Sequence, residues 1–321
     1  MKILVTGGAG FIGSHLSERL ISDGHNVTVI DNFSTGRASN LANILGIENF
    51  ALVEGSILDI SVLKPLIDDA DYIFHLAASV GVFNIVNNPL ASLLTNIRGT
   101  ENVLEAAHAT KTPVFLTSSS EVYGKNISDS LKESDDRILG SPVTLRWSYS
   151  EAKAIDESLA YAYFVEKQLE TRIVRFFNTV GPRQLGAYGM VVPRFVKAAL
   201  ANKPVTIYGD GKQTRCFAHV YDVIDAVLAI AFAQNTIGKV VNIGNDFEIS
   251  IYGLAKKIID ETKSNSEIVY VPYYEAYGEG FEDMERRVPN IDLISQLVGW
   301  KPKRDLSAMI ADISAEMKKS S

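Results

Sequence analysis

Residues 2–13, with the sequence KILVTGGAGFIG, decide the fold of this chain of 321 residues. The segment Lys2 to Thr6 predicts a short buried strand, and residues 14–21 have the apolar periodicity of a helix. Three glycines lie between them, where glycine lets the backbone turn tightly and approach a pyrophosphate at the helix N-terminus. They are Gly7, Gly10 and Gly13. The spacing is GxxGxxG and not the more common GxGxxG, but its place between strand and helix predicts a dinucleotide cradle.

The next predicted strand, residues 27–30, ends in an acid. Asp31 follows Gly13 by 18 residues. A carboxylate at this place hydrogen-bonds the adenosine ribose diol and repels a 2′-phosphate, which favours NAD over NADP. Arg37, in the loop that follows, is a mild signal in the opposite direction. A simple turn residue is the alternative for Asp31, and the sequence favours the NAD role.

Further strands and helices alternate along the first half of the chain. Apolar strands are predicted at 50–53, 71–75 and 114–117, with helices at 61–67 and 90–109. Such alternation predicts an α/β fold with a doubly wound parallel sheet (Rossmann), whose ligands lie beyond the carboxyl ends of the strands. This geometry adds further candidate cofactor contacts beside the glycines and Asp31. They are Phe11, Ile12, Asn32, Ser34, Thr35, Gly36, Asp59, Ile60, Leu76, Ala77, Ala78, Asn96 and Ser118.

Composition excludes several classes of partner. The net charge of −7 and pI near 5.4 argue against a nucleic-acid groove, which needs a basic face. The single cysteine, Cys216, excludes internal disulfides and fits a cytoplasmic protein. The apolar run 220–233 contains two aspartates and cannot span a membrane. His75 and His219 are expected to pack at strand ends, and no metal site is predicted.

The second half of the chain is less regular. We expect an NAD-binding domain over residues 1–175 and a smaller substrate-binding lobe over 176–321, with some segments such as 240–243 returning to the main sheet. Three segments, 184–191, 204–216 and 270–289, are expected to be loops around this lobe. Ser250 has the position of an N-cap for a helix over 251–262.

Tyr149 and Lys153 are the candidate catalytic pair. Four residues apart, they lie on one face if the segment is helical. Tyrosine ionises near pH 10, and a lysine ammonium one turn away favours the phenolate, so the pair can take a proton from a substrate hydroxyl. A chance pair on a surface helix is the alternative for this spacing alone. The dinucleotide loop, which supplies an oxidant, favours the catalytic interpretation.

The helix that continues beyond Lys153 has an apolar stripe. It consists of Ala154, Ile155, Leu159, Tyr163 and Val165. The stripe predicts contact with another helix, either in a homodimer or within the core of one chain.

With these residues in place, the chain resembles the extended short-chain dehydrogenase/reductases that modify nucleotide sugars. The resemblance covers nearly the whole length and has seven markers. They are GGAGFIGSHL (7–16), DNFSTGR (31–37), HLAA (75–78), SSSEVYG (118–124), YSEAK (149–153), FFNTVGPRQ (176–184) and YGDGKQTRCF (208–217). The resemblance implies a UDP-sugar substrate, with NAD at the glycine loop and Asp31, and with its nicotinamide at Tyr149 and Lys153.

The resemblance also implies roles at the substrate. Ser118 or Ser119 corresponds to the residue that hydrogen-bonds the sugar hydroxyl. Asn178 and Arg215 resemble the residues that contact the diphosphate, where a bidentate guanidinium suits the anion. Val192 is a further candidate substrate contact. A surface salt bridge is the alternative role for Arg215.

Two features bear on the reaction. Glu121 stands where sugar decarboxylases of the group carry glutamate and 4-epimerases usually carry a small or neutral residue. Ser120 lacks the acid that 4,6-dehydratases have there, although it remains a candidate catalytic residue. The stretch 285–290, ERRVPN, resembles the Arg-Arg-x-Pro-Asp motif of UDP-glucuronate decarboxylases, and residues 140–149 resemble a related bacterial decarboxylase. The resemblance implies that Arg287 acts beside the sugar carboxylate, although Asn290 departs from the motif.

We therefore expect C4 oxidation of a UDP-hexuronic acid followed by loss of carbon dioxide, with Glu121 or a water that it holds protonating C5. The sequence supports a UDP-sugar 4-epimerase almost equally at the oxidation step. A non-catalytic NAD-sensing module is the remote alternative, because a pure sensor needs none of Tyr149, Lys153 and the serine run 118–120.

Overall fold

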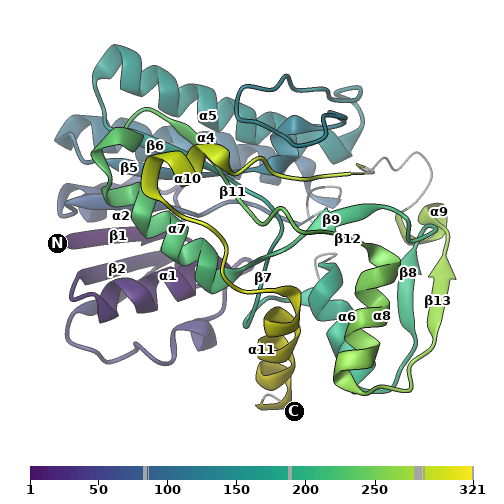
Figure 1. The fold of residues 1–321 in the computed structure, drawn as a ribbon. Coiled ribbons are helices and arrows are strands. Elements are labelled where there is room, and N and C mark those ends of the chain that lie inside the picture. The colour runs from purple at the N-terminus through teal and green to yellow at the C-terminus, as the bar shows by residue number, and fades with distance from the viewer. Residues whose placement is uncertain (82–84, 86, 187–189, 278–283, 285, 320–321) are drawn as a thin grey trace.

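A central parallel sheet organises the molecule (Figure 1). The computed structural model describes residues 1–81, 85, 87–186, 190–277, 284 and 286–319. The sheet has seven strands in the order β11-β6-β5-β4-β1-β2-β3, and every neighbouring pair is parallel. The strands are β1 (Lys2–Thr6), β2 (Asn26–Asp31), β3 (Phe50–Glu54), β4 (Tyr72–His75), β5 (Val114–Ser119), β6 (Thr171–Phe176) and β11 (Val240–Ile243). The predicted doubly wound α/β fold is confirmed.

Helices cover both faces of this sheet. The helices on one face are α1 (Phe11–Ser22), α7 (Val220–Phe232) and α10 (Asp292–Val298). Those on the other are α2 (Ile60–Asp68), α4 (Pro89–Thr110) and α5 (Ser148–Lys167). Because successive strand side chains point to opposite faces, Phe115 joins the first core and its neighbour Leu116 joins the second. Strands buried on both faces read as continuous apolar runs, which is why the sequence located them.

A second lobe packs beside the carboxyl edge of the sheet (Figure 1). Its helices are α6 (Val191–Leu200), α8 (Ile251–Thr262) and α11 (Leu306–Lys319), which share one apolar core. They pack with the parallel pair β8 (Val205–Tyr208) and β13 (Ile268–Val271). Two further pairs are β7 (Thr179–Val180) with β10 (Ala218–His219) and β9 (Thr214–Cys216) with β12 (Glu248–Ser250).

The expected loops of this lobe are partly wrong. Segment 204–216 contains β8 and β9, because Val205 and Ile207 alternate into the lobe's core. The first residues of 270–289 end β13 and form α9 (Tyr273–Tyr277), whereas 278–283 and 285 lie outside the described residues. In 184–191, residues 187–189 also lie outside them. The Ser250 cap is confirmed, since its hydroxyl accepts a hydrogen bond from the backbone N–H of Gly253 at 3.0 Å.

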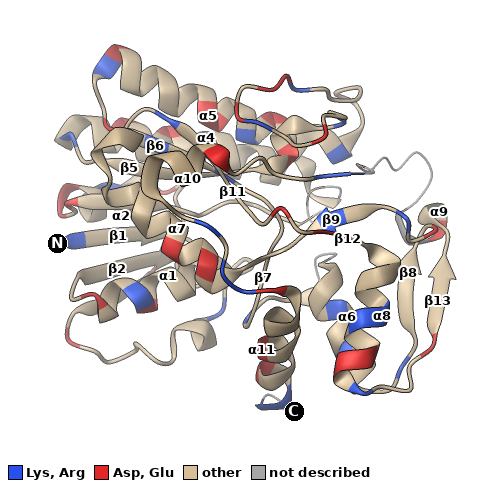
Figure 2. Cartoon of the chain, in the orientation of Figure 1, with Lys and Arg blue, Asp and Glu red and all other residues tan. Residues whose placement is uncertain are grey.

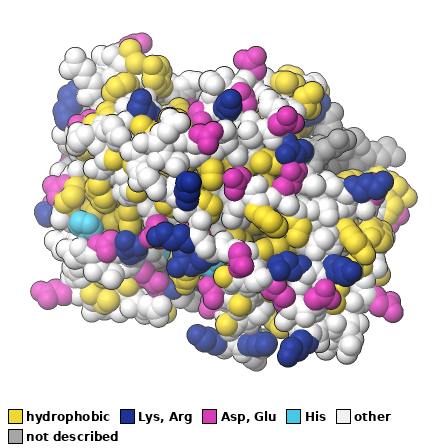
Figure 3. Space-filling view, viewed as in Figure 1, with side chains coloured by type: hydrophobic (Ala, Val, Ile, Leu, Met, Phe, Trp, Pro, Cys, Tyr) yellow, Lys and Arg dark blue, Asp and Glu magenta, His cyan; other side chains and the backbone are white. Residues whose placement is uncertain are grey.

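Short 3₁₀ helices connect the larger elements. They are η1 (Ala38–Leu41), η2 (Ser120–Tyr123), η3 (Leu145–Trp147) and η5 (Gln234–Thr236). Elements η2 and η3 bring the serine run and the start of α5 together. Figures 2 and 3 show acidic and basic residues interspersed over the visible face. Each helix of the described chain is too short or too polar to cross a membrane.

Candidate active site

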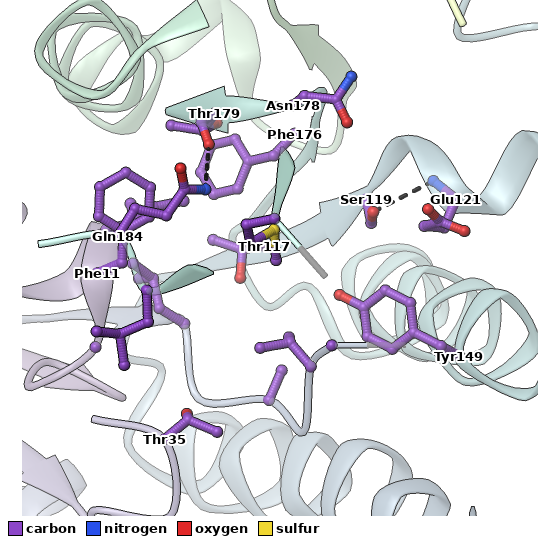
Figure 4. Close-up of a pocket in the computed structure, with 18 of the residues that line it drawn as sticks. Phe11, Thr35, Thr117, Ser119, Glu121, Tyr149, Phe176, Asn178, Thr179 and Gln184 are labelled. Carbon is purple, nitrogen blue, oxygen red and sulfur yellow. Dashed lines mark hydrogen bonds between the residues drawn. The ribbon is translucent and has the colours of Figure 1, made fainter. Parts of the chain in front are cut away.

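A cleft of about 500 Å³ lies at the carboxyl ends of the sheet strands, between the sheet and the second lobe. The glycine loop lines one end, and residues from α6, β8 and β9 line the other. Most of the predicted site residues meet in this cleft, which Figure 4 shows from close range. They are Gly7, Gly10, Phe11, Ile12, Gly13, Asp31, Asn32, Ser34, Thr35, Leu76, Ala77, Ala78, Ser118, Ser119, Ser120, Glu121, Tyr149, Lys153, Asn178, Val192, Arg215 and Arg287.

The glycine loop is packed so closely that side chains would not fit. A Cβ on Gly13 would lie 2.3 Å from the carbonyl oxygen of Gly7. Gly7 itself has φ +71°, and a Cβ there would lie 2.7 Å from the backbone nitrogen of Ala77. The backbone therefore turns tightly at the N-terminus of α1, which is the shape that a pyrophosphate cradle needs. This loop fits the predicted dinucleotide.

Asp31 lies at the end of β2 beside this loop. Its two carboxylate oxygens accept hydrogen bonds from the backbone N–H groups of Ala9 (2.9 Å) and Phe33 (2.8 Å). Burial raises the pKa of Asp31, and the two N–H donors oppose that effect. The carboxylate is thus fixed at the wall of the cleft, where the ribose diol of a dinucleotide would meet it.

Four predicted cofactor contacts are not part of the cleft lining among the described residues: Gly36, Asp59, Ile60 and Asn96. Asp59 caps α2, where its side chain accepts hydrogen bonds from the backbone and hydroxyl of Ser61. Asn96 accepts a hydrogen bond from the N–H of Ser79 at 2.7 Å, and so holds the loop after Ala78. Gly36 lies against the Asp31 carboxylate.

Tyr149 and Lys153 lie in the first turns of α5, as their spacing predicts. In Figure 4 the phenol of Tyr149 points into the cavity, on the same side as Ser119 and Glu121. The ammonium of Lys153 donates to the carbonyl of Thr117 (3.0 Å) and to the carboxylate of Asp156 (3.1 Å). The pair is therefore assembled at the cleft.

The electrostatics of Tyr149 differ from what Lys153 alone predicts. The pKa of Tyr149 is raised above its ordinary value, first by burial and then by the charges of Glu121 and Asp156, while the nearby hydroxyl of Ser119 lowers it. Asp156 lies within ion-pair distance of Lys153 and offsets its charge. The lysine therefore does not bring the pKa of Tyr149 below its ordinary value. Asp156 is a residue that the sequence reasoning missed.

Glu121 lies between two arginines. Its carboxylate contacts Nη1 of Arg146 at 2.6 Å and Nη2 of Arg287 at 2.8 Å, and Arg287 also donates to Ser120 at 3.3 Å. Burial alone would raise the pKa of Glu121, but the two guanidinium groups outweigh it and hold the pKa at about 2. We name Arg146, Glu121 and Arg287 the arginine–glutamate triad.

Arg146 had a place in the sequence motif but no predicted role. The triad forms because η3 carries Arg146 against η2, which carries Glu121, while the C-terminal segment brings Arg287 from the other side. All three side chains are largely buried and line the cleft. The triad thus places two guanidinium groups and one carboxylate at the wall of the cleft.

The far end of the cleft holds the predicted diphosphate contacts. Asn178 donates to the carbonyl of Cys216 at 3.0 Å, and Arg215 on β9 donates to the carbonyl of Thr214 at 2.8 Å. Val192 lies buried on α6. Further lining residues that the sequence reasoning missed are Arg194, Tyr208, Gln213 and Tyr273. The guanidinium of Arg194 stacks 4.1 Å from the Tyr208 ring, and Gln213 donates to the Tyr273 hydroxyl at 2.9 Å.

The two histidines considered in the sequence, His75 and His219, are not among the described residues that line the cleft. His75 hydrogen-bonds Thr6 and Thr100 at the end of β4, and His219 contacts Asp312. Across the described ranges, no group of three or more His, Cys, Asp or Glu side chains could hold a metal ion.

Comparisons with known proteins agree with this geometry. A sequence profile of the NAD dependent epimerase/dehydratase family matches residues 3–244. The chain is 41% identical over 302 residues to UDP-N-acetyl-alpha-D-glucosaminuronate decarboxylase of Bacillus cytotoxicus, covering 94% of this chain and 92% of that protein. It is 38% identical over 303 residues to UDP-glucuronic acid decarboxylase 1 of Xenopus tropicalis, covering 94% and 68%.

Solved structures of similar shape include 4-epimerases and a dTDP-glucose 4,6-dehydratase. UDP-glucuronic acid 4-epimerase from Bacillus cereus, in complex with UDP-glucuronic acid and NAD, superposes with a TM-score of 0.88 at 29% identity over 100% of both chains. UDP-glucose 4-epimerase from Thermotoga maritima, with UDP-glucose, gives a TM-score of 0.90 at 30% identity, covering 100% of this chain and 99% of that one.

Proposed function

Because the chain belongs to the NAD-dependent epimerase/dehydratase family, we propose that it is an NAD-dependent decarboxylase of a UDP-hexuronic acid. UDP-glucuronate is the first candidate substrate, and a UDP-pentose is the product. The observation that carries this proposal is the arginine–glutamate triad, because it places the guanidinium of Arg287 on the wall of the cleft that Tyr149 also lines. The names of the similar decarboxylases support the same reaction.

The triad suits an acidic sugar for an electrostatic reason. A carboxylate that enters the cleft would be stabilised there by a charge-assisted hydrogen bond from a buried guanidinium. Arg287 lies on the cleft wall and already contacts Ser120, which places a bidentate donor near the candidate sugar site. A neutral hexose would not form such a pair with Arg287.

The residues divide the chemistry among them. Bound NAD supplies a hydride acceptor at C4 and later returns the hydride. Tyr149 takes the proton from the C4 hydroxyl as a phenolate, a form that burial and the charges of Glu121 and Asp156 disfavour and that the positive charge of a bound nicotinamide would favour. Ser119 orients the C4 oxygen. The resulting 4-keto acid loses carbon dioxide, because the neighbouring ketone accepts the electron pair of the broken bond as an enolate. Arg287 holds the carboxylate until it leaves.

Reprotonation of C5 is assigned to a water held by Glu121. A carboxyl whose pKa is held at about 2 stays ionised at neutral pH, and hence it has no proton of its own to give. As an acceptor it can orient a water that gives a proton to C5, and the hydroxide left behind takes a proton from the solvent, which is the one proton that the overall reaction consumes. Of the two proton sources expected from the sequence, Glu121 itself or a water that it holds, we thus propose the water.

A UDP-sugar 4-epimerase is the second candidate, favoured by the close match to solved 4-epimerases. It would use the same oxidation at Tyr149 and return the hydride to the other face of the sugar. The two reactions differ in whether carbon is lost.

The test is to incubate the purified protein with four separate substrates and follow carbon dioxide and the product sugars. These are UDP-glucuronate, its 2-acetamido analogue, UDP-glucose and UDP-N-acetylglucosamine. Carbon dioxide with a UDP-pentose supports the decarboxylase, and the acid that turns over faster identifies the sugar. Interconversion of hexoses or hexuronates without carbon dioxide would reject it in favour of the epimerase. No turnover on any of them would favour the sensing module.

Tyr149→Phe tests the base directly. The kcat is expected to fall about 10²- to 10⁴-fold, because the phenylalanine ring cannot accept the proton. NAD binding, followed by calorimetry, should persist because the glycine loop and Asp31 are untouched. Unchanged turnover would show that another group removes the proton.

We further propose a homodimer in the cytoplasm. Of the predicted stripe on α5, Ile155 and Val165 are 42% and 58% exposed, and Tyr161 beside them is 52% exposed. Leu159 and Tyr163 instead pack against the core of one chain. The exposed apolar side chains of α5 support contact with a second copy, and the buried single cysteine Cys216 fits a reducing compartment.

A further inference from the structure

Lys153 has a buried acid as its neighbour. Asp156 lies almost one turn further along α5, and its side chain has no exposed surface. One carboxylate oxygen contacts Nζ of Lys153 at 3.1 Å, and the ammonium also donates to the carbonyl of Thr117 at 3.0 Å. The other oxygen, Oδ1, is buried and has no hydrogen-bond partner within the described structure.

Such an arrangement is poor as a source of stability. A buried carboxylate with one unmatched oxygen pays a large desolvation penalty, and well-packed apolar side chains often replace buried ion pairs without loss. An ammonium buried without a counter-charge, however, tends to release its proton. We therefore attribute the presence of Asp156 to the counter-charge that it supplies to Lys153, and not to the stability of the core.

Other charged groups around this pair are already engaged. His75 on β4 faces Lys153, and its pKa is lowered to about 3, by burial first and then by the lysine, so it is neutral. Glu157, the next residue of α5, is paired with Arg175 of β6 at 2.7 Å. Burial raises the pKa of Asp156, while the charge of Lys153 and the nearby hydroxyl of Thr100 on α4 lower it.

The remaining charges near the phenol belong to the triad on η2, η3 and the C-terminal segment. Glu121 is held there by Arg146 and Arg287. The charge of Asp156 also raises the pKa of Tyr149. Its contribution is smaller than those of burial and of the charge of Glu121. Asp156 thus acts on both members of the catalytic pair, with opposite consequences.

We propose that Asp156 is a positioning residue for the proton transfer at Tyr149. It keeps Lys153 charged and fixed against Thr117, and by its own charge it sets the pH range in which Tyr149 works. The inference rests on the proposed roles of Tyr149 and Lys153, and it is independent of which sugar is the substrate.

The variant Asp156→Asn tests this through the pH profile of kcat/KM. Removing the carboxylate favours the phenolate, so the acidic limb should move to lower pH. It also removes the counter-charge of the ammonium, so the basic limb should move to lower pH as well. The variant-to-parent ratio of kcat/KM is therefore expected to be about three-fold or more higher at the acidic end of the profile than at the basic end. A uniform loss of activity without a shift would overturn the proposal.

A second readout needs no substrate. With NAD saturating, the near-ultraviolet tyrosinate band of Asp156→Asn is compared with that of Asp156→Asn/Tyr149→Phe across alkaline pH, and the same difference is taken for the parent and Tyr149→Phe. Each difference isolates the ionisation of Tyr149. Its midpoint should differ in the Asn background, lower where the lost carboxylate charge dominates and higher where Lys153 has released its proton. An equal midpoint contradicts the proposal even if no sugar is turned over.

Two further variants separate positioning from folding. Glu157→Gln removes the adjacent buried acid, which pairs with Arg175, and is expected to lower stability without shifting the midpoint. Asp156→Glu keeps the charge but displaces it, so kcat should fall while the pH profile stays near that of the parent. If Asp156→Asn does not fold, Asp156→Glu alone serves as the test. A pH profile of this variant in which both limbs shift as predicted for loss of the carboxylate would refute the proposal, because the charge is still present.

Discussion

Glu121 contacts two guanidinium groups at the wall of the cleft. Arg146 and Arg287 approach the carboxylate from opposite oxygens at 2.6 and 2.8 Å. The side chains of all three are at most 16% exposed, so solvent screens them weakly. The proposed preference for an acidic sugar therefore depends on this triad.

The variant Arg146→Met tests the triad. It keeps the approximate length of the side chain and removes the charge, so kcat/KM for UDP-glucuronate is expected to fall about thirty-fold or more. NAD affinity should be unchanged. Arg137→Met is the matched control, since Arg137 pairs with Glu151 in a partly exposed position outside the triad. Comparable losses in both variants would contradict a special role for Arg146.

Single residues also show where sequence reasoning succeeds. The placement of Tyr149 and Lys153 side by side at the cleft could be predicted, because both lie on one helix, where the spacing fixes their geometry. Arg146 pairs with Glu121, which lies 25 residues earlier in the chain. The two residues lie on separate 3₁₀ helices, and the sequence spacing does not predict that these helices come into contact. Asp156 lies in the same helix as Lys153, but its burial depends on α4 and β5, which the sequence does not place.

At the scale of elements, α8 depends on its first residue. The hydroxyl of Ser250 accepts the N–H of Gly253, one of the donors that a helix start leaves without an internal partner. Ser250→Ala is expected to lower the free energy of unfolding by about 1 kcal/mol, measured by denaturant titration. Thr262→Ala on the same helix is the control. Its hydroxyl donates to carbonyls within the helix, so a smaller change is expected, and equal losses would argue against capping.

Elements of the main sheet and of the second lobe were predictable to different degrees. The central strands are buried on both faces and read as apolar runs. Strand β8 is short and half exposed, and its partner β13 begins only at Ile268. A strand that is stabilised by a distant partner resembles a loop when the sequence is read locally, which explains the error over 204–216.

The whole molecule has one surface on which the proposed second copy can be tested. Replacing Ile155 and Val165 together with glutamate places two charges on the exposed apolar face of α5. The mass from light scattering is expected to fall from dimer to monomer. Tyr252→Glu, which changes an exposed aromatic on α8, should leave the mass unchanged. A parent protein that is monomeric at all concentrations would reject the proposed dimer.

The sheet takes its seventh strand and the cover of one face from late in the chain. Strand β11 pairs with β6, and α7 and α10 pack over the same face as α1. During synthesis on the ribosome, the early strands must therefore wait with an open edge and a bare apolar surface until α7, β11 and finally α10 have emerged. Nascent chains of this protein are hence expected to need shielding by chaperones for longer than a chain whose nucleotide-binding half closes on its own.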